Sequence, residues 1–531
     1  MEAFWAGLQV TFTPEILLLV LAGTVLGIVV GALPGISGST TTALLLPLTI
    51  MMSPIAALAF LGSIYCASNY GGSITAILIN TPGDPSASAT AFDGYPLARR
   101  GEAGRALGMS AVASAIGGIF SVVVLIVAAP WLARLAYQFG PPEYFALALF
   151  GLSMVAAVGG ESPSKNLLAG ATGVLLATVG LDLTTGVERF TFDVPALSDG
   201  LEFIPVLVGL FAISELFERM AQKGIVQEYV KLKSMDMPSW ADFKKCAKAI
   251  VLSSGIGTFI GALPALGATT AALICYNETK RWSKHKEEFG HGAIEGVAGP
   301  EAANNAAVGG AMVPTLALGI PGSTTTAIIL AGLLIQGVRP GPHLFNEQPT
   351  LLYVVFGSML VCNLLYLFLG FLFAKGFARI TLIPDALLWP AVFILSVVGA
   401  YAPNQSMVDV MIMLAFGVVG YLFRRYGFSP APLIMGLVLG KLVEETLKQS
   451  LLIFDQDWTL FFSRPVVVVL FVITAASLLV IVLLSPQVDY LPVAQTDMIW
   501  NNFRLPPGGN IETARAEMAP VVIERLRPYL Q

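Results

Sequence analysis

The chain has 531 residues, of which 56% are hydrophobic and only 12% are charged. Soluble domains carry about twice that share of charge, so the composition excludes an ordinary soluble protein and predicts one with many membrane-spanning helices. A net charge of −5 without basic patches argues against a nucleic-acid partner, and four scattered cysteines argue against a zinc site or a disulfide framework. We therefore expect no metal centre, no cofactor and no nucleic-acid binding.

Long apolar stretches predict the crossings. A helix needs roughly 20 apolar residues to span a bilayer, and on that basis the sequence predicts about a dozen crossings in an all-α polytopic fold. They are expected near residues 15–31, 54–80, 106–130, 143–159, 165–181, 201–217, 293–318, 324–338, 350–374, 385–400, 406–423 and 464–485. No Lys or Arg precedes Arg99, so we expect no cleavable signal peptide.

Two apolar pieces, 38–52 and 249–276, are too short or too interrupted to cross alone. Basic residues flank 249–276 on both sides, so the positive-inside rule places both of its ends in the cytoplasm. Two arms of about 10–13 residues, or about 15–20 Å of helix, then predict a re-entrant hairpin. Its tip, Gly261–Thr270, should line a water-filled space, because non-helical backbone inside a membrane needs polar partners.

An internal repeat is visible between the two halves. GALPGISGSTTT at 31–42 matches GALPALGATT at 261–270, 230 positions later. Gly71-Gly72 matches Gly309-Gly310 after 238 positions, and Pro82-Gly83 matches Pro321-Gly322 after 239. Because the order is the same, we predict a first membrane repeat at 1–217, a cytoplasmic basic linker at 218–248, a second repeat at 249–485 and a polar C-terminal tail at 486–531.

The charge around the repeated GALP motif differs between the halves. Only the second copy is flanked by Lys and Arg, and the first has no cation nearby in the sequence. Opposite loop charge predicts opposite orientation, and inverted repeats with broken helices are typical of secondary transporters. The hexapeptide GSTTTA occurs at 38–43 and 322–327, once in a GALP element and once in a PG element, so the two copies are not equivalent positions of the repeat.

The breaks in these helices predict the binding site. Pro and Gly free backbone groups, a half-helix presents its N–H groups to an anion, and hydroxyls serve both a carboxylate and Na⁺. The alternative is that each hydroxyl bonds back to its own helix or lets helices approach closely. The candidate substrate- and ion-binding residues are Gly35, Ser37, Ser39, Thr40, Thr41, Asn80, Thr81, Gly83, Asp84, Ser86, Thr269, Thr270, Asn304, Asn305, Gly322, Ser323, Thr324 and Thr325.

Two acidic residues are of particular interest. Asp84 follows a PG pair in an apolar region, where an acid indicates a functional site, although a helix N-cap would also explain it. Glu301 lies three and four residues before Asn304 and Asn305, so the three side chains are expected on one helix face. That face either lines the site or serves capping and packing.

Three long segments resemble a known family: GALPGISGSTTTALLLPLT, YGGSITAILINTPGDPSASATAFDGYPLARRGEAGRALG and FGHGAIEGVAGPEAANNAAVGGAMVPTLALGIPGSTTTAIILAGLLIQGVRPGPHLF. They are similar to the large membrane subunit of the tripartite tricarboxylate transporters, the TctA family, over about residues 15–485. The resemblance implies a multi-pass protein of the bacterial inner membrane that imports citrate-like or related carboxylates by alternating access. It also implies coupling to a cation gradient, with Na⁺ as the expected ion.

The same resemblance implies two protein partners, a small membrane subunit (TctB-like) and a periplasmic solute-binding protein (TctC-like). The alternative from the residues is a channel or facilitator for small organic anions, which needs neither a coupling ion nor a binding protein. An enzyme is not expected, because the chain has no GxSxG or HExxH motif.

Overall fold

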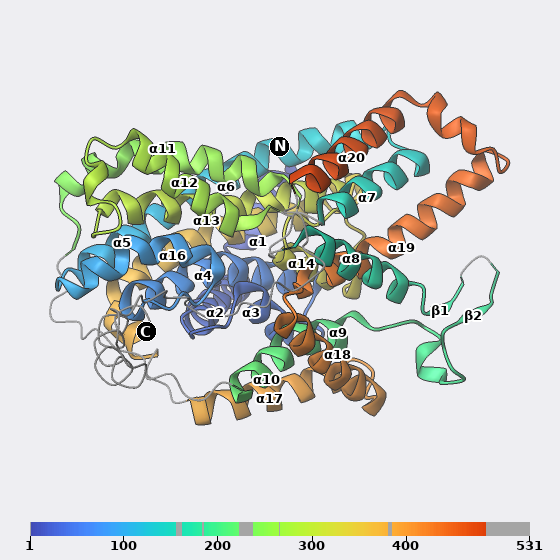
Figure 1. Cartoon of the computed structure of the whole chain (residues 1–531), viewed down its shortest axis with the longest axis horizontal. Coiled ribbons are helices and arrows are strands. Elements are labelled where there is room, and N and C mark those ends of the chain that lie inside the picture. Colours follow the sequence, from blue (N-terminus) through green and yellow to red (C-terminus); the bar gives the residue numbers. More distant parts are fainter. Residues whose placement is uncertain are drawn as a thin grey trace, which may run out of the picture. The chain divides into compact units, whose positions relative to one another are not determined.

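A computed structural model describes residues 2–155, 162–182, 185–221, 237–264, 266–380 and 385–484 (Figure 1). The predicted tail at 486–531, residues 222–236 of the predicted linker and the hairpin residue Ala265 lie outside the described residues. Inside them the chain is almost wholly helical. Its one sheet pairs two-residue antiparallel strands, β1 (Gly180–Leu181) and β2 (Glu188–Arg189).

The helices follow the apolar stretches closely. In the first half they are α1 (Glu2–Thr11), α2 (Pro14–Gly31), α3 (Gly38–Leu45), α4 (Pro54–Ile79), α5 (Ser88–Arg99), α6 (Ala103–Ala136), α7 (Pro141–Val155), α8 (Pro163–Ala177), α9 (Phe203–Val208) and α10 (Ser214–Ala221). In the second half they are α11 (Trp240–Ala262), α12 (Gly267–Trp282), α13 (Ile294–Leu318), α14 (Thr324–Ile335), α15 (Pro342–Glu347), α16 (Pro349–Ile380), α17 (Asp385–Tyr401), α18 (Met407–Arg425), α19 (Pro430–Ile453) and α20 (Pro465–Leu484). Short 3₁₀ turns include η2 (Pro85–Ala87), and a π-helical turn, η4 (Gly209–Ile213), joins α9 to α10.

Four of the described helices are long and apolar enough to cross a membrane: α2, α6, the Pro349–Leu372 part of α16, and α18. Large apolar side chains stay exposed along them, for example Leu18, Val127, Phe368 and Met411. Exposed apolar surface on a long helix is what contact with lipid requires. The fold is therefore that of an all-α membrane protein, and the number of about a dozen crossings stays a prediction.

Helix α19 was missing from the predicted crossings. Its first turns, PAPLIMGLVLG, are apolar and buried against α7 and α8. Its later turns carry Glu444 and Lys448, which interrupt the apolar pattern in the sequence. Lys448 Nζ donates to both carboxylate oxygens of Asp182 at 2.8 Å and to Glu444 Oε1 at 2.7 Å, and Arg189 also pairs with Glu444. These ion pairs stabilise the charged second part of α19, which continues directly from its buried apolar first part.

The segment around 249–276 forms two antiparallel helices, α11 and α12, which lie side by side in Figure 1. Cys275 Sγ donates to Ser253 O across the pair over 3.9 Å. The arms are 23 and 16 residues long, so the predicted arm length of about 10–13 residues was wrong. A capping box between Ser239 and Asp242 starts α11 at Trp240, inside the segment predicted as linker. Whether this pair re-enters the membrane stays a prediction.

Helices α2 and α4 pack in the same way as α11 and α13. A β-carbon on Gly71 would lie 2.6 Å from Ile28 O and 3.1 Å from Ala32 N. A β-carbon on Gly310 would lie 2.3 Å from Thr258 O and 3.1 Å from Ala262 N. The contacted residues Ile28 and Thr258 are 230 positions apart, which is the offset between the two GALP motifs. Gly71 and Gly310 are 239 positions apart, which is the offset between the two PG motifs.

The correspondence continues along both helix pairs. Gly31 meets Ser68 O at 2.5 Å, and Gly261 meets Ala307 O at 2.4 Å, measured from a β-carbon built on each glycine. Helices α4 and α13 each end at a residue with left-handed backbone conformation, Asn80 with φ 53° and Gly319 with φ 73°. Only glycine permits backbones to approach so closely. These contacts pair Gly71 with Gly310, one position away from the register expected from the sequence.

Candidate functional site

The first hydroxyl-rich break forms the start of α3. Ser37 is the N-cap, and its Oγ accepts from Thr40 N at 3.1 Å. The hydroxyls of Ser39 and Thr40 lie 2.8 and 2.9 Å from Ser37 Oγ, so the three oxygens form one cluster at the positive end of the helix. Thr41 differs, because its hydroxyl donates to Ser37 O at 3.0 Å within its own helix.

Asp84 connects the two motifs of the first half. Its carboxylate is 9% exposed, and Oδ2 accepts from Gly38 N, the first amide of α3, at 2.6 Å. Oδ1 accepts from Ser86 N at 2.8 Å, so Asp84 is also the N-cap of η2. Gly83 and Gly72 permit this close approach, since Gly83 N donates to Gly72 O at 3.1 Å. Asp84 is thus a helix cap with a buried side chain, and its binding role stays a prediction.

The second break forms the start of α14. Ser323 and Thr326 make a capping box, with Ser323 N donating to Thr326 Oγ1 at 2.8 Å. The Tyr65 hydroxyl of α4 lies 3.1 Å from Ser323 Oγ, and Gly322 N donates to Thr315 Oγ1 at 3.2 Å. Thr324 and Thr325 follow in the first turn of the helix. Helix α3 packs against α14, so the structure brings together the two helices that begin in the GSTTTA segments.

The remaining motifs meet in the reciprocal way. Helix α12, which carries Thr269 and Thr270 in its first turn, packs against η2 and α5, the elements that follow Asp84. Thus each GALP element packs against the PG element of the other half. Asn80 is exposed and ends α4, and Thr81 Oγ1 donates to Ile79 O at 3.3 Å.

Asn304 and Asn305 lie elsewhere, beside Glu301 at the centre of α13. Asn304 Nδ2 is 3.5 Å from Glu301 Oε1, and Asn305 Nδ2 donates to Asn304 Oδ1 at 2.6 Å. Glu301 is completely buried and accepts hydrogen bonds from four hydroxyl side chains. These belong to Ser73 of α4, Thr90 of α5, and Ser110 and Ser114 of α6.

The candidate list omitted Glu301 and its four hydroxyl partners, as well as Tyr65. Ser110 and Ser114, four residues apart in an apolar stretch, are a signal that the sequence does contain. Their convergence with Ser73 and Thr90 on one carboxylate is a tertiary feature, which spacing alone does not reveal.

A cation does lie beside the first GALP motif, contrary to expectation. Arg219 of α10 donates from Nη2 to Pro34 O at 3.0 Å, and a β-carbon on Gly35 would collide with this guanidinium. Glu215 pairs with both Arg219 and Arg424. The contact joins residues 185 positions apart, so it could not be seen in the local sequence. Gly35, with φ +82°, is required here both for its backbone and for the space.

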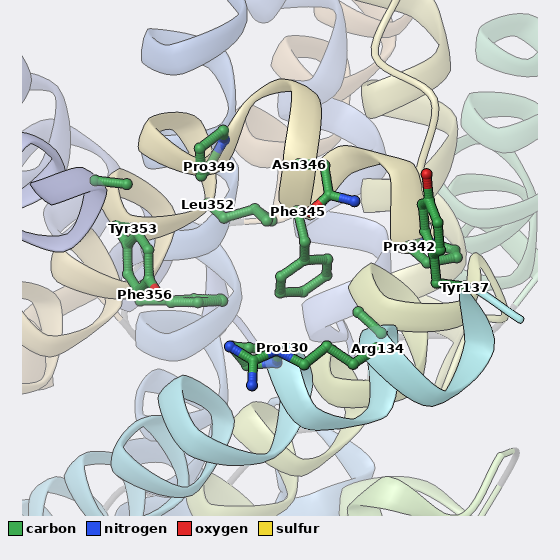
Figure 2. A pocket seen from close by; sticks show the side chains of 12 residues that line it. Pro130, Arg134, Tyr137, Pro342, Phe345, Asn346, Pro349, Leu352, Tyr353 and Phe356 are labelled. Carbon is green, nitrogen blue, oxygen red and sulfur yellow. The ribbon is translucent and has the colours of Figure 1, made fainter. Parts of the chain in front are cut away.

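A cavity of ≈ 310 Å³ lies between α1, α6, α15 and α16. Arg134, Tyr137, Asn346 and Tyr353 are among its lining residues, and Figure 2 shows Arg134 lying beneath Phe345. None of the candidate residues lines this cavity. The hydroxyl-rich starts of α3, α12 and α14 are therefore separate from this cavity.

Together these features define a multi-pass helical membrane protein with hydroxyl-rich helix starts at its Pro and Gly breaks. The chain matches the family described as "Tripartite tricarboxylate transporter TctA family" over residues 17–435, and it belongs to that family. This is a family of transporters, not of enzymes.

Two curated relatives come from Agrobacterium vitis. The "Uncharacterized 52.8 kDa protein in TAR-I ttuC' 3'region" is 40% identical over 486 residues, covering 92% of this chain and 95% of that protein. The "Uncharacterized protein in TAR-II ttuC' 3'region" is 40% identical over 210 residues, covering 40% of this chain and 87% of that protein. No solved structure matches the chain.

Proposed function

We propose that this chain is the large transmembrane subunit of a binding-protein-dependent secondary transporter in the bacterial inner membrane. It imports citrate-like tricarboxylates or related carboxylates by alternating access, and a Na⁺ gradient drives the uptake. A small TctB-like membrane subunit and a periplasmic TctC-like solute-binding protein complete the transporter. Membership of the TctA family supports the transport function.

The observation that carries the proposal is the start of α3 beside Asp84, in a helix that packs against α14. Hydroxyls and amides at helix N-termini are suited to a carboxylate. Asp84, however, already occupies Gly38 N and adds a negative charge, and it forms no ion pair with any described residue. An organic anion can bind next to this carboxylate only when a cation offsets the repulsion. Coupling between cation and substrate follows from that requirement.

The duplicated architecture belongs to the same proposal. Two repeats of opposite orientation, with broken helices and a re-entrant α11–α12 hairpin, would place both hydroxyl clusters near the middle of the membrane. The matching contacts of Gly71 and Gly310 support the duplication, and the loop charges support the inversion. An elevator-like movement of the hairpin-bearing part rests on fold-level analogy.

The test is uptake into proteoliposomes that contain this chain and its small membrane partner. Labelled di- and tricarboxylates are supplied with or without the binding protein, under inward Na⁺, K⁺ or choline gradients. The proposal predicts uptake only with both Na⁺ and the binding protein. Downhill flux that needs neither would instead establish the channel or facilitator.

A binding measurement isolates the coupling. Substrate affinity of the purified membrane complex is measured in Na⁺ and in choline at constant ionic strength. We expect affinity to fall by at least about tenfold without Na⁺, because the Asp84 charge is then uncompensated. Equal affinity in both media would refute the role of Na⁺.

A further inference from the structure

Four hydroxyl side chains surround the Glu301 carboxylate and donate hydrogen bonds to it. Ser73 Oγ donates to Oε1 at 2.5 Å, and Thr90 Oγ1 donates to the same oxygen. Ser110 and Ser114 donate to Oε2 at 2.9 and 2.8 Å. A carboxylate has about four lone-pair positions, so these donors saturate an ionised Glu301.

The charge of Glu301 nevertheless has no counterion. Throughout the described part of the chain, no Lys, Arg or His forms an ion pair with it, although it is completely buried. Hydrogen bonds offset only part of the cost of burying an isolated charge, which is several kcal/mol or more. A bound cation with a single charge would neutralise the site, whereas a divalent ion would leave a buried excess positive charge.

A second observation, on the same helix, indicates a missing hydrogen-bond partner. Asn305, one turn further along α13, is 1% exposed, and its Oδ1 has no hydrogen-bond partner in the structure. Buried amide oxygens are almost always paired, so an orphaned one needs an explanation. A carboxylate, hydroxyls and an amide oxygen are together the oxygen-only environment that hard cations prefer.

The comparison of the two halves argues that the fold does not require this cluster. At the offset of 239 positions that relates Gly71 to Gly310, the residue that corresponds to Glu301 is Gly62. A β-carbon there would meet only Met359 Cγ at 3.5 Å and Val355 Cγ1 at 3.9 Å, both apolar. Helix α4 thus packs against α16 at the corresponding place without a carboxylate or hydroxyls. A purely structural role would leave the burial of a charge in the second half unexplained.

We propose that Glu301, with the hydroxyls of Ser73, Thr90, Ser110 and Ser114 and the amide oxygen of Asn305, forms a Na⁺ site between α4, α5, α6 and α13. The site rests on the proposed function and deepens it, because it adds a second cation position to the one that offsets the charge of Asp84. When Na⁺ binds, the hydroxyl groups rotate so that their oxygen lone pairs face the ion. Because Ser73 lies next to Gly72, which contacts Asp84, occupancy of this site is positioned to affect the α3 start across α4.

The test is Na⁺ binding to the full-length purified chain, measured without transport. Thermal unfolding is followed as Na⁺ replaces choline at constant ionic strength. The wild-type protein is expected to show a saturable rise in Tm. Glu301→Gln should raise the half-saturating Na⁺ concentration by about tenfold or more, because it removes the charge. Ser114→Ala, which removes one oxygen, should raise it about threefold.

Glu301→Gln is expected to fold, since the amide can accept from two hydroxyls and donate to the others. Glu295→Gln is the matched control, because Glu295 is also buried on α13. Among the described residues its side chain accepts a hydrogen bond only from Ser283 Oγ, at 2.7 Å, away from the cluster. Its Na⁺ response should equal that of the wild type. Ser114→Ala keeps the test valid should Glu301→Gln prove unstable.

A folded Glu301→Gln protein with unchanged Na⁺ response overturns the site. The site is also overturned if the Tm of the wild type responds to pH and not to Na⁺, and Glu301→Gln abolishes that pH response. Glu301 would then bind a proton. The proposed function is judged separately by uptake. Na⁺-driven uptake that survives in Glu301→Gln overturns the site alone, and wild-type uptake indifferent to Na⁺ overturns the proposed coupling.

Discussion

The long helices α4 and α13 make corresponding contacts with α2 and α11, yet their acidic residues differ. Glycines recur at several of the close backbone contacts, as Gly71 and Gly310 show. Acidic residues do not recur, because Asp84 corresponds to Ser323, and Gly62 to Glu301. Packing between membrane helices depends on small residues and not on charge, so the shared glycines reflect the fold. The unshared carboxylates are the residues to which we assign the cation chemistry.

The largest effect is expected where the halves agree. Gly71→Ala and Gly310→Ala each place a methyl group within 2.6 Å and 2.3 Å of a backbone oxygen on the partner helix. Each should destabilise the protein by about 1–3 kcal/mol or prevent its folding. Thermal unfolding of both variants checks this. Gly255→Ala on α11 is the control, since open space surrounds that position. A large loss in only one of the pair would contradict their equivalence.

The next effect is expected where the halves differ. Asp84→Asn removes the charge and leaves one acceptor for the two amides Gly38 N and Ser86 N. Uptake should fall about tenfold or more, and the amide left without an acceptor should cost about 1–3 kcal/mol of stability. Ser323→Ala at the corresponding position removes a neutral cap and should cost about 1 kcal/mol of stability. Initial uptake rates and unfolding temperatures of the two variants separate these outcomes. Similar uptake in both would remove the functional distinction between the halves.

A smaller effect concerns the polar end of α11. The Arg105 guanidinium holds the pKa of Asp242 down at about 2, with help from Ser239. Because the pKa is lowered in the folded protein, this pair stabilises the protein above about pH 4 and the contribution is lost as pH falls toward 2. Asp242→Asn should therefore cost about 1 kcal/mol at neutral pH, allowing for solvent screening of the pair.

The measurement for that pair is thermal unfolding of wild type and Asp242→Asn between pH 3 and pH 7. The difference between them should shrink toward the acidic end. A difference that is constant with pH would show that the ion pair does not contribute to stability.

The smallest effect is expected at the link between the halves. Tyr65→Phe removes the hydroxyl that lies 3.1 Å from Ser323 Oγ, a neutral contact worth about 0.5–1.5 kcal/mol. Ser323 keeps its capping box, so folding should be nearly unaffected and substrate affinity should change by about three- to fivefold at most. Loss of all uptake would instead place the Tyr65 hydroxyl in direct contact with the substrate.

Local sequence predicted the features that depend on local physics. Apolar runs located most of the long helices, and the Pro-Gly and Ser-Thr clusters marked helix starts, as Ser37 and Ser323 confirm. The family resemblance was confirmed by the match over residues 17–435. The arms of the α11–α12 pair were predicted too short, because a capping box at Ser239 outweighs the polarity of the first turns.

Contacts between distant segments could not be predicted in this way. Arg219 reaches Pro34, and four hydroxyls from three helices meet at Glu301, only after the helices have packed. The pairing of α3 with α14, and of α12 with η2, likewise depends on tertiary arrangement. The binding roles of the candidate residues stay predictions.

The most direct test of the account is to measure labelled carboxylate and labelled Na⁺ in the same proteoliposomes, containing the chain, its small membrane partner and the binding protein. The account predicts that both enter together in a fixed ratio, and that an inward Na⁺ gradient drives the carboxylate above its external concentration. Carboxylate entry without accompanying Na⁺ would contradict it.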